Sequence, residues 1–465
     1  MLASDTIVAI ATARGHAAVG IVRLSGPDAF AIAARIWVRH PASARLPVFK
    51  PGRIHHGWIM TPAAAGGRRL IDEVILLPFQ GPHSYTGEDV VEIQGHGGEA
   101  VLNAILHLCL QQGARMAMPG EFTKRAFLAG KLDLTQAESV MDLISAGSER
   151  ALSQAAGNLH AQTLTRLLDT LRETLIDVQM QIVASVDFPD EVDEPDRLPL
   201  IDQLTALQLQ ANALKMSSDH QHQLNEGVRV AILGLPNSGK SSLFNALLAS
   251  DRAIVTDMAG TTRDVLSERL QINGVPVLLI DTAGIRETEN RVEILGIHRS
   301  WEAAETAQGV LYVVDATQGL SAADQQVLNR LDTTRVPVVQ VWNKVDQTSD
   351  HDCPPEGLAV SALGGHGLPR VFGVLSDWVT ALSEAPEQTE AAFTGLALNQ
   401  RQVACLESLS EHLTLAAESL SQQSLPLDVT TVPLSDALHA LDRLSGRDAT
   451  EHVLDAVFSR FCVGK

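Results

Sequence analysis

This 465-residue chain lacks several features that would place it in a specialised class. Its four cysteines, at positions 109, 353, 405 and 462, form no Cys-x-x-Cys pair, which excludes a cysteine-based zinc module and fits a reducing compartment. No apolar run approaches the roughly 18–20 residues that cross a bilayer. The first residues contain an early Asp5 and no basic leader, so no signal peptide is expected. We therefore expect a cytoplasmic protein without membrane attachment.

Aromatic residues are also scarce, at 4% of the chain with 2 Tyr and 5 Trp. The cores must therefore consist mainly of Leu, Val, Ile and Ala, a composition that favours helix. Hydrophobic residues make up 45% and charged residues 19% of the chain, as in ordinary globular proteins. At roughly 100–200 residues per domain, two to four domains are expected.

The formal net charge is -20, which argues against a nucleic-acid partner. The charge is unevenly distributed, because residues 1–131 contain 13 Lys and Arg against 9 Asp and Glu. A mildly basic first region could bind RNA or a polyanionic small molecule, or it could be an ordinary solvated surface.

The first 115 residues alternate short β-like runs with turn signals. Residues 6–11 and 19–26 predict a hairpin, and residues 73–79 and 89–97 predict further strands. Residues 98–113 have helical periodicity that ends at a glycine. This pattern predicts a small α+β domain.

The rest of the chain changes pattern three times. Apolar residues at helical spacing over about 132–220 predict long amphipathic helices, interrupted by an acidic solvated loop at 187–199. Strand–loop–helix units follow from about 227, and helical periodicity returns near 396. We therefore predict a multidomain α/β chain in which an α/β domain is inserted into a helical one. The predicted boundaries are 1–118, 119–222, 223–384 and 385–465.

The strongest motif is GLPNSGKS at 234–241, which follows a buried-type strand and opens a helix. It is a complete G-x-x-x-x-G-K-[ST] phosphate loop in its required context. Gly234 and Gly239 permit the tight turn and the close approach of phosphate oxygens. Lys240 is predicted to reach the β- and γ-phosphates, and the Ser241 hydroxyl to ligate Mg²⁺.

The next buried run, 275–284, ends in D-x-x-G. Asp281 suits a water-mediated contact to Mg²⁺, and Gly284 can turn toward the γ-phosphate. The following residue is Ile285, where many GTPases place a glutamine that orients water. Because isoleucine cannot do so, another group must orient the attacking water.

A third run, 336–346, ends in N-K-x-D. The Asp346 carboxylate complements the two N–H donors on guanine's Watson–Crick edge. Asn343 is predicted to brace the base or the loop, Lys344 to lie along the ring, and residues 360–363 to supply a backbone donor. In this order the motifs specify a guanine nucleotide and resemble the translation-factor-related class of small GTPases.

Two further residues bear on catalysis. The Asn237 side chain either helps ligate a monovalent cation beside the phosphates or stabilises the turn. Thr262, in the segment 254–265, is predicted to close on Mg²⁺ when GTP binds. The complete predicted set of GTP-binding residues is Asn237, Ser238, Gly239, Lys240, Ser241, Ser242, Thr256, Thr261, Thr262, Asp281, Thr282, Ala283, Gly284, Asn343, Lys344, Asp346, Ser361, Ala362 and Leu363.

Many separated blocks, in order along nearly the whole chain, carry a closer resemblance. The blocks are DTIVAIAT (5–12), GIVRLSG (20–26), TGEDVVEIQGHGG (86–98), PGEFTKRAFLAGKLDLTQAE (119–138), DFPDE (187–191), GLPNSGKSSLFNAL (234–247), IVTDMAGTTRDV (254–265), DTAGIRE (281–287) and FCVGK (461–465). Together they resemble the tRNA-modification GTPase family MnmE, also called TrmE.

The resemblance implies an N-terminal domain similar to folate-binding aminomethyltransferase domains, which also forms a constitutive homodimer. It implies a flavoprotein partner, MnmG, and installation of an aminomethyl-type group, such as carboxymethylaminomethyl, at carbon 5 of the wobble uridine of certain tRNAs. The one-carbon unit would come from 5-formyl- or methylene-tetrahydrofolate. G domains would pair in the GTP state, aided by potassium.

The resemblance also implies roles for single residues. Arg23, Glu92, Lys131 and Lys465 match the family's folate-contacting positions, where cations suit folate carboxylates and a carboxylate suits the pterin N–H donors. Glu293 matches the acid that orients water through a bridging water, which would solve the problem that Ile285 poses. Catalysis would thus rest on Glu293, Lys240 and Thr262, and Mg²⁺ on Ser241 and Thr262. Potassium would be held by Asn237, Thr256, Met258 and Thr261.

Cys462 matches a family cysteine that was suspected of covalent chemistry with the uridine. Its neighbours Phe458, Phe461 and Val463 favour a role as a small core residue instead. A different function also stays open, namely an RNA-binding assembly GTPase of the ribosome-biogenesis type without modification chemistry. The blocks 86–98 and 461–465 argue against it.

Overall fold

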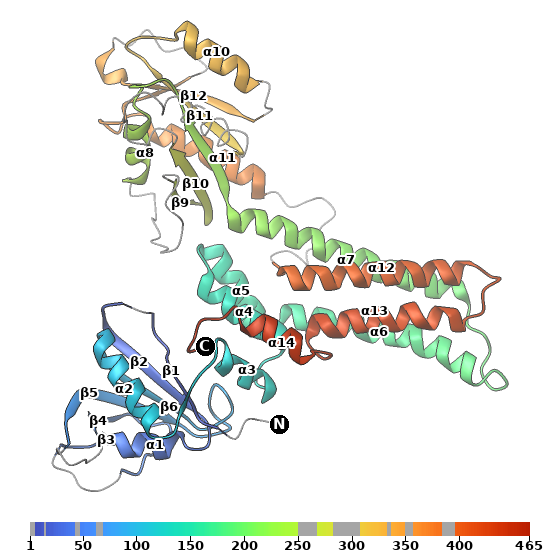
Figure 1. Ribbon diagram of the computed structural model, residues 1–465. Helices are drawn as coiled ribbons and strands as arrows, with labels where there is room; N and C mark the ends of the chain where they lie inside the picture. The colour runs from blue at the N-terminus through green and yellow to red at the C-terminus, as the bar shows by residue number, and fades with distance from the viewer. Residues whose placement is uncertain are drawn as a thin grey trace. The chain divides into compact units, whose positions relative to one another are not determined.

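The computed structural model describes residues 5–13, 15–41, 47–61, 68–249, 267–281, 307–332, 336–348, 357–383 and 396–465 (Figure 1). The chain forms two compact units. The first comprises Met1–Met141, Asn158–Pro195 and Ser424–Lys465, and the second comprises Asp142–Gly157 and Asp196–Gln423. Within the described parts of the chain, every helix is too short or too polar to cross a bilayer.

The first unit begins with a seven-stranded sheet in the order β3-β4-β5-β6-β2-β1-β7. Its strands are β1 (Ile7–Ile10), β2 (Ala17–Ser25), β3 (Trp37–Val38), β4 (His55–Met60), β5 (Leu70–Phe79), β6 (Val90–Gly97) and β7 (Arg115–Met116). All neighbours pair antiparallel except β1 and β7. The predicted hairpin is confirmed, since Ile7 lies opposite Ser25.

Two helices, α1 (Ala29–Ile36) and α2 (Glu99–Gln111), pack against this sheet. Alternation along the strands sends Val22 and Leu24 of β2 into the core that the sheet shares with these helices. Arg23 stands between them, so its side chain belongs to the opposite face. This face carries the polar residues discussed below.

Further helices complete the first unit, namely α3 (Glu121–Leu128), most of α4 (Leu134–Ser145), α6 (Thr163–Asp187), α13 (Asp428–Ser445) and α14 (Glu451–Phe458). The helices α6 and α13 lie side by side along most of their length (Figure 1). An apolar stripe with helical spacing on α6, from Leu164 to Ile182, is buried as predicted. The residues 187–194 that follow are exposed, which confirms the solvated acidic loop.

The second unit contains a similar helix pair, α7 (Arg197–Glu226) and α12 (Gln400–Ser421), together with α5 (Glu149–Ala161). The Asp196 carboxylate caps α7 by accepting a hydrogen bond from the Leu198 amide. The helix ends at Gly227, and the first strand of a second sheet begins at the next residue. The α/β domain is therefore continuous with α7.

The second sheet has six strands in the order β13-β12-β11-β8-β10-β9, parallel except for the edge strand β9. The strands are β8 (Val228–Leu233), β9 (Ser267–Ile272), β10 (Val275–Asp281), β11 (Gly309–Asp315), β12 (Val338–Asn343) and β13 (Leu358–Val360). One face packs against α8 (Lys240–Leu248) and α11 (Leu368–Ser383), and the other against α10 (Ala322–Leu331). This is the predicted P-loop architecture.

Gly227 allows the sharp exit from α7 into β8. Its φ is +83°, and an added Cβ would lie 2.1 Å from the Pro276 carbonyl oxygen. Neither the backbone conformation nor the space admits a side chain.

We therefore expect Gly227→Ala to destabilise the second unit by about 2 kcal/mol or more, because the backbone at Pro276 would have to move to make room for the methyl group. Gly274→Ala is the matched control, since its φ is +77° but a Cβ there meets nothing within 4 Å. It should cost only about 1 kcal/mol. The stability of both variants can be measured by urea titration, with release of fluorescent GDP as the signal of unfolding. Equal urea midpoints for the two variants would contradict the expectation.

Candidate functional site

The phosphate loop joins β8 to α8. Gly239 has a φ of +94°, and a Cβ on it would lie 2.1 Å from the Asn343 side-chain nitrogen. Lys240 Nζ donates a hydrogen bond to the Leu235 carbonyl at 2.9 Å, which draws its side chain across the loop. Asn237 has a φ of +63° and is exposed. The loop is thus shaped by left-handed backbone at Asn237 and Gly239, a conformation typical of loops whose N–H groups bind anions.

Asn343 braces this loop from the end of β12. Its amide nitrogen donates to the Ser238 carbonyl at 3.1 Å, and its amide oxygen accepts the Ala362 N–H at 3.1 Å. The side chain is only 2% exposed. The sequence predicts that Asn343 braces either the base or the loop, and in the structure it connects the phosphate loop to the loop after β13.

Lys344 makes the second connection to the loop. Its ammonium donates to the Asn237 carbonyl at 2.7 Å and to Asp315 Oδ2 at 2.6 Å. Burial works to raise the pKa of the Asp315 carboxyl, but hydrogen bonds from Lys344 and Thr317 outweigh it and hold that pKa below its ordinary value. Asp315 is therefore a fixed negative charge that orients Lys344.

The predicted guanine-recognition residues lie beside this clamp. Asp346 is exposed on the short helix η2 (Val345–Gln347), so its carboxylate is accessible to a base. Ser361 and Ala362 are buried, and the Ser361 N–H donates to the His366 carbonyl. Leu363 is 86% exposed. The loop after β13 is thus held by backbone hydrogen bonds to Asn343 and within the loop itself.

The donor set of this loop fits a magnesium–nucleotide complex. Ser241 and Ser242 are exposed in the first turn of α8, where hydroxyls and the helix N-terminus face oxyanions. The Ser238 hydroxyl is 3% exposed and lacks a hydrogen-bond partner among the described residues. Such an orphaned buried hydroxyl is usually satisfied by a ligand or water.

Several predicted residues cannot be placed. Asp281 ends β10 opposite Ile232, but its side chain lies outside the described part of the structure. Outside the described residues lie Thr256, Met258, Thr261, Thr262, Thr282, Ala283, Gly284, Ile285 and Glu293. Their predicted roles in Mg²⁺ and K⁺ binding and in orienting water stay predictions.

A second polar site lies on the open face of the N-terminal sheet. Arg23 Nη2 and Glu92 Oε1 are 2.8 Å apart, and both side chains are mostly buried. The rings of Tyr85 and Phe122 each have their centre 5.7 Å from the Arg23 guanidinium carbon. Two neighbouring strands and two aromatic faces therefore hold this ion pair in place.

The C-terminus of the chain reaches the same site. Arg23 Nη1 donates to the Gly464 carbonyl at 3.4 Å, and the Phe122 N–H donates to the Lys465 carbonyl at 3.2 Å. Burial and the nearby Arg23 lower the pKa of the Lys465 ammonium, while Glu92 opposes the shift. The structure thus brings Lys465 to Arg23 and Glu92, from which the sequence separates it by hundreds of residues.

Lys131 and Cys462 differ from this group. Lys131 is exposed, and its Cε would lie 3.7 Å from a Cβ on Gly87, so it borders the loop that precedes β6. Cys462 is also exposed, whereas Phe458 and Phe461 are buried. The interpretation of Cys462 as a core residue is therefore wrong, because the chain turns outward after Phe461 and exposes both Cys462 and Val463.

Sequence reasoning missed three residues of these sites, namely Asp315, Tyr85 and Phe122. Asp315 ends the buried strand β11, and acidic residues at strand ends had already marked Asp281 and Asp346. The same signal could have found it. No local pattern marks Tyr85 and Phe122 as partners of Arg23, because their contact is tertiary.

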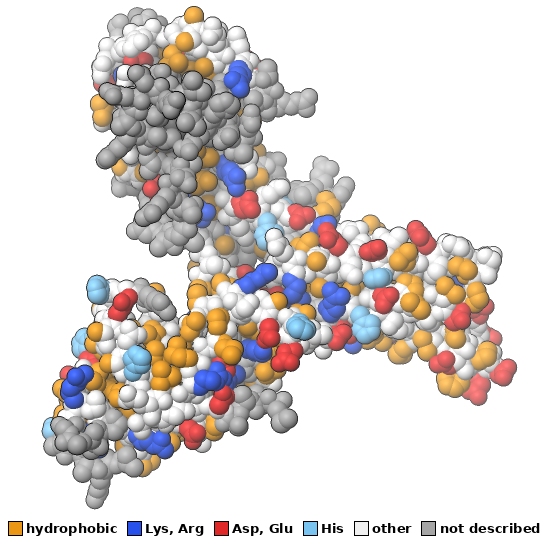
Figure 2. Space-filling model, in the orientation of Figure 1, with side chains coloured by type: hydrophobic (Ala, Val, Ile, Leu, Met, Phe, Trp, Pro, Cys, Tyr) orange, Lys and Arg blue, Asp and Glu red, His pale blue; other side chains and the backbone are white. Residues whose placement is uncertain are grey.

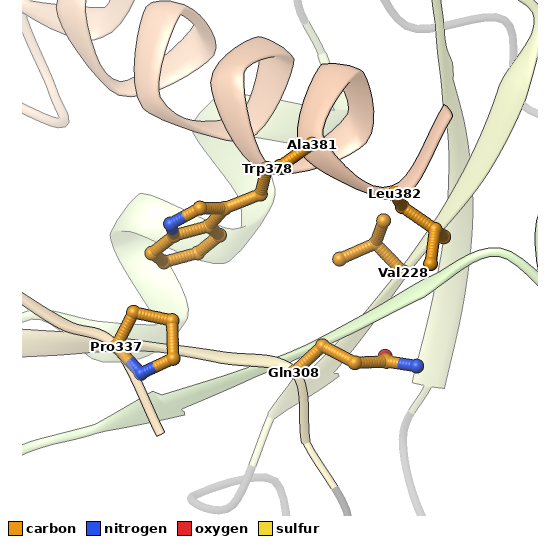
Figure 3. Close-up of a pocket in the computed structure, with 6 residues that line it drawn as sticks. All are labelled: Val228, Gln308, Pro337, Trp378, Ala381 and Leu382. Carbon is orange, nitrogen blue, oxygen red and sulfur yellow. The ribbon is translucent and has the colours of Figure 1, made fainter. Parts of the chain in front are cut away.

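A cavity of about 290 Å³ lies elsewhere in the second unit (Figure 3). Its lining residues come from the starts of β8, β11 and β12 and from the end of α11, and they are Val228, Gln308, Pro337, Trp378, Ala381 and Leu382. The phosphate loop and the N-K-x-D segment follow the opposite, carboxyl ends of these strands. This largely apolar cavity therefore does not belong to the nucleotide site.

Comparison with known proteins identifies the family. A model described as the GTP-binding protein TrmE N-terminus matches residues 6–131, and one for the MnmE helical domain matches 134–462. A Synechococcus protein named tRNA modification GTPase MnmE is 42% identical over 99% of this chain and 98% of its own length. The chain belongs to the MnmE family of tRNA modification GTPases.

A second relative agrees with this assignment. A Nostoc protein with the same name is 40% identical over the full length of both chains. Among solved structures, Aquifex aeolicus Era bound to GDP and AlF4⁻ is 27% identical and covers 40% of this chain and 67% of its own, with a TM-score of 0.26. As a member of the MnmE family, the chain is a GTP hydrolase, and GTP with Mg²⁺ is the ligand set of such enzymes.

The Asp315–Lys344 pair leads to a direct test. Asp315→Asn removes the charge that orients Lys344, and leaving a partly buried ammonium without its partner costs about 1–3 kcal/mol. We expect GDP to bind roughly 10-fold more weakly. Asp377→Asn, at an exposed position of α11, should leave binding unchanged. Fluorescent-GDP titration measures both; affinities within twofold of each other would refute the role of Asp315.

Proposed function

We propose that this chain hydrolyses GTP in a K⁺-stimulated cycle of G-domain pairing that drives tRNA modification. With a flavoprotein partner, MnmG, it would form the carboxymethylaminomethyl or aminomethyl group at carbon 5 of wobble uridine 34, using a tetrahydrofolate one-carbon unit. The proposal includes a cytoplasmic homodimer that pairs through its N-terminal domains.

The observation that carries the proposal is the meeting of the chain's C-terminus with the N-terminal sheet. Lys465 comes within the electrostatic range of Arg23 and Glu92, and backbone hydrogen bonds hold the tail there. A protein that acts only as a GTPase switch has no need for this second polar site, whose residues lie in other parts of the sequence than the nucleotide site. Similarity to relatives over the full length supports the same choice against a ribosome-assembly switch.

The chemistry of this site suits a reduced folate. Glu92 offers a carboxylate to the adjacent N–H donors of a pterin, and Arg23, Lys131 and Lys465 offer cations to the glutamate carboxylates. In the structure Arg23 pairs with Glu92. Folate binding would therefore exchange this internal pair for contacts with the ligand.

The nucleotide half follows the phosphate-loop chemistry. Lys240 and the loop N–H groups would hold the phosphates, while Ser241 and Thr262 would hold Mg²⁺ and Asn237, Thr256, Met258 and Thr261 would hold K⁺. These cations supply positive charge that stabilises the phosphoryl transition state. Glu293 would orient the attacking water through a second water.

Potassium dependence tests the role of Asn237. We expect GTP hydrolysis at least about 10-fold faster in KCl than in NaCl, because the ion supplies charge that an arginine finger provides elsewhere. Asn237→Ala should abolish the difference, whereas Asn245→Ala, at an exposed position of α8, should retain it. Equal wild-type rates in the two salts would contradict the proposal.

The modification itself is tested in cells that lack the protein. We expect nucleoside mass spectrometry of their tRNA to show loss of carbon-5 aminomethyl-type uridines, which wild type should restore. Arg23→Ala should not restore them, although its GTP hydrolysis in vitro should be unchanged, and it should bind 5-formyl-tetrahydrofolate at least about 10-fold more weakly. Lys124→Ala, which removes a surface ion pair with Asp455, is the control and should restore modification.

An unchanged nucleoside profile in the cells without the protein would overturn the proposed function. The assembly-switch interpretation would then take its place. Full restoration by Arg23→Ala would instead contradict only the folate site.

A further inference from the structure

One segment of the N-terminal domain is strongly basic although the whole chain carries a charge of -20. Residues 29–71 contain seven Lys and Arg, three His and no Asp or Glu. In the rest of residues 1–131, six basic residues face nine acidic ones. The basic excess of this domain therefore comes entirely from one stretch.

Three basic residues in the described part of this stretch lie at one edge of the N-terminal sheet, around β3 and β4. Val38 of β3 lies opposite Trp58 of β4, so Arg39 continues alongside β4. The Lys50 amide and carbonyl both lie 3.2 Å from the ring nitrogen Nε2 of His55. The Arg53 N–H donates to the Lys50 carbonyl. These contacts place three exposed cationic side chains, which we call the basic edge, on neighbouring backbone.

The cations of the basic edge have no carboxylate partner among the described residues. Elsewhere in the domain, ion pairs within 3.1 Å hold Arg23, Arg115 and Arg125. Near the basic edge the carboxylate of Glu73 pairs with His56 instead. Figure 2 shows Lys, Arg and His side chains at the surface of this part of the domain. Their charge is thus available to an anionic partner.

One partly exposed aromatic ring, that of Trp58, lies on β4 opposite Val38, the residue before Arg39. The Trp58 ring is partly exposed and contacts His40 and His56, with ring centres 5.8 and 5.3 Å away. Cationic side chains interleaved with accessible aromatic rings are typical of surfaces that bind the backbone and the unstacked bases of RNA. An acidic protein surface would use the charges but not the rings.

We infer that the basic edge is a surface by which this chain contacts tRNA directly. The inference rests on the proposed function, since it names where the substrate tRNA would bind. Phosphates would be neutralised by Arg39, Lys50 and Arg53, and an unpaired base could stack on Trp58. A symmetric contact between two copies through this surface is disfavoured, because two basic edges repel each other.

The test uses the full-length protein and an unmodified transcript of a tRNA with uridine at the wobble position. We expect Arg39→Glu/Arg53→Glu to bind at least about 10-fold more weakly in fluorescence anisotropy. The slope of log affinity against log salt, between 50 and 200 mM KCl, should fall by about two. Arg39→Gln/Arg53→Gln, which adds no acid, should weaken binding in the same direction.

The matched control is Arg166→Glu/Arg370→Glu, which makes the same change in net charge at exposed positions of α6 and α11. It should change tRNA affinity less than twofold. GTP hydrolysis should be unchanged in all variants, which shows that the G domain folds, and an unchanged circular dichroism spectrum shows the same for the rest of the chain.

Three results with the variants would overturn the inference. One is unchanged affinity of the basic-edge variants, and another is an equal loss in the control. The third is retained tRNA affinity with loss of flavoprotein binding, which would assign the surface to a protein contact. Wild-type protein that binds no tRNA would also overturn it and leave the nucleoside profile, which tests the proposed function, unaffected.

Discussion

The nucleotide site depends on one buried amide, the side chain of Asn343. It donates to the phosphate loop and accepts from the loop after β13, so it ties together segments that follow three parallel strands. Its position also explains why Gly239 must lack a side chain, since a Cβ would occupy the place of the amide nitrogen. Lys344 adds a charged connection to the same loop and is itself oriented by Asp315. The loop is thus preorganised before a nucleotide binds.

The N-terminal site differs from the nucleotide site, because it combines residues from the N-terminal sheet with residues from the C-terminal tail. Arg23 and Glu92 face each other across adjacent strands, and Gly464 and Lys465 join them from the end of the chain, beyond the helical segments. A site assembled in this way cannot form in an isolated N-terminal fragment with the same geometry. If folate binds there, its affinity would report on the placement of the C-terminal tail.

Acidic and basic residues are unevenly distributed over the chain. The acidic residues at 187–194 are exposed. Residues 29–71, which include the basic edge, contain no Asp or Glu. An acidic chain gains solubility from its net charge and repels nucleic acid over most of its surface. A local basic region can then select where a polyanion docks, with a strength that depends on salt.

The sequence by itself determined the element types, the phosphate loop, the N-K-x-D segment and the family, because strand alternation, helical spacing and motif order are local properties. It also placed Arg23 and Glu92 in one site through a family resemblance. Tertiary structure decided that Asn343 braces loops, that Asp315 orients Lys344, that Tyr85 and Phe122 flank Arg23, and that Cys462 faces solvent. These are contacts between residues far apart in the chain, and they follow from register and packing that no local pattern encodes.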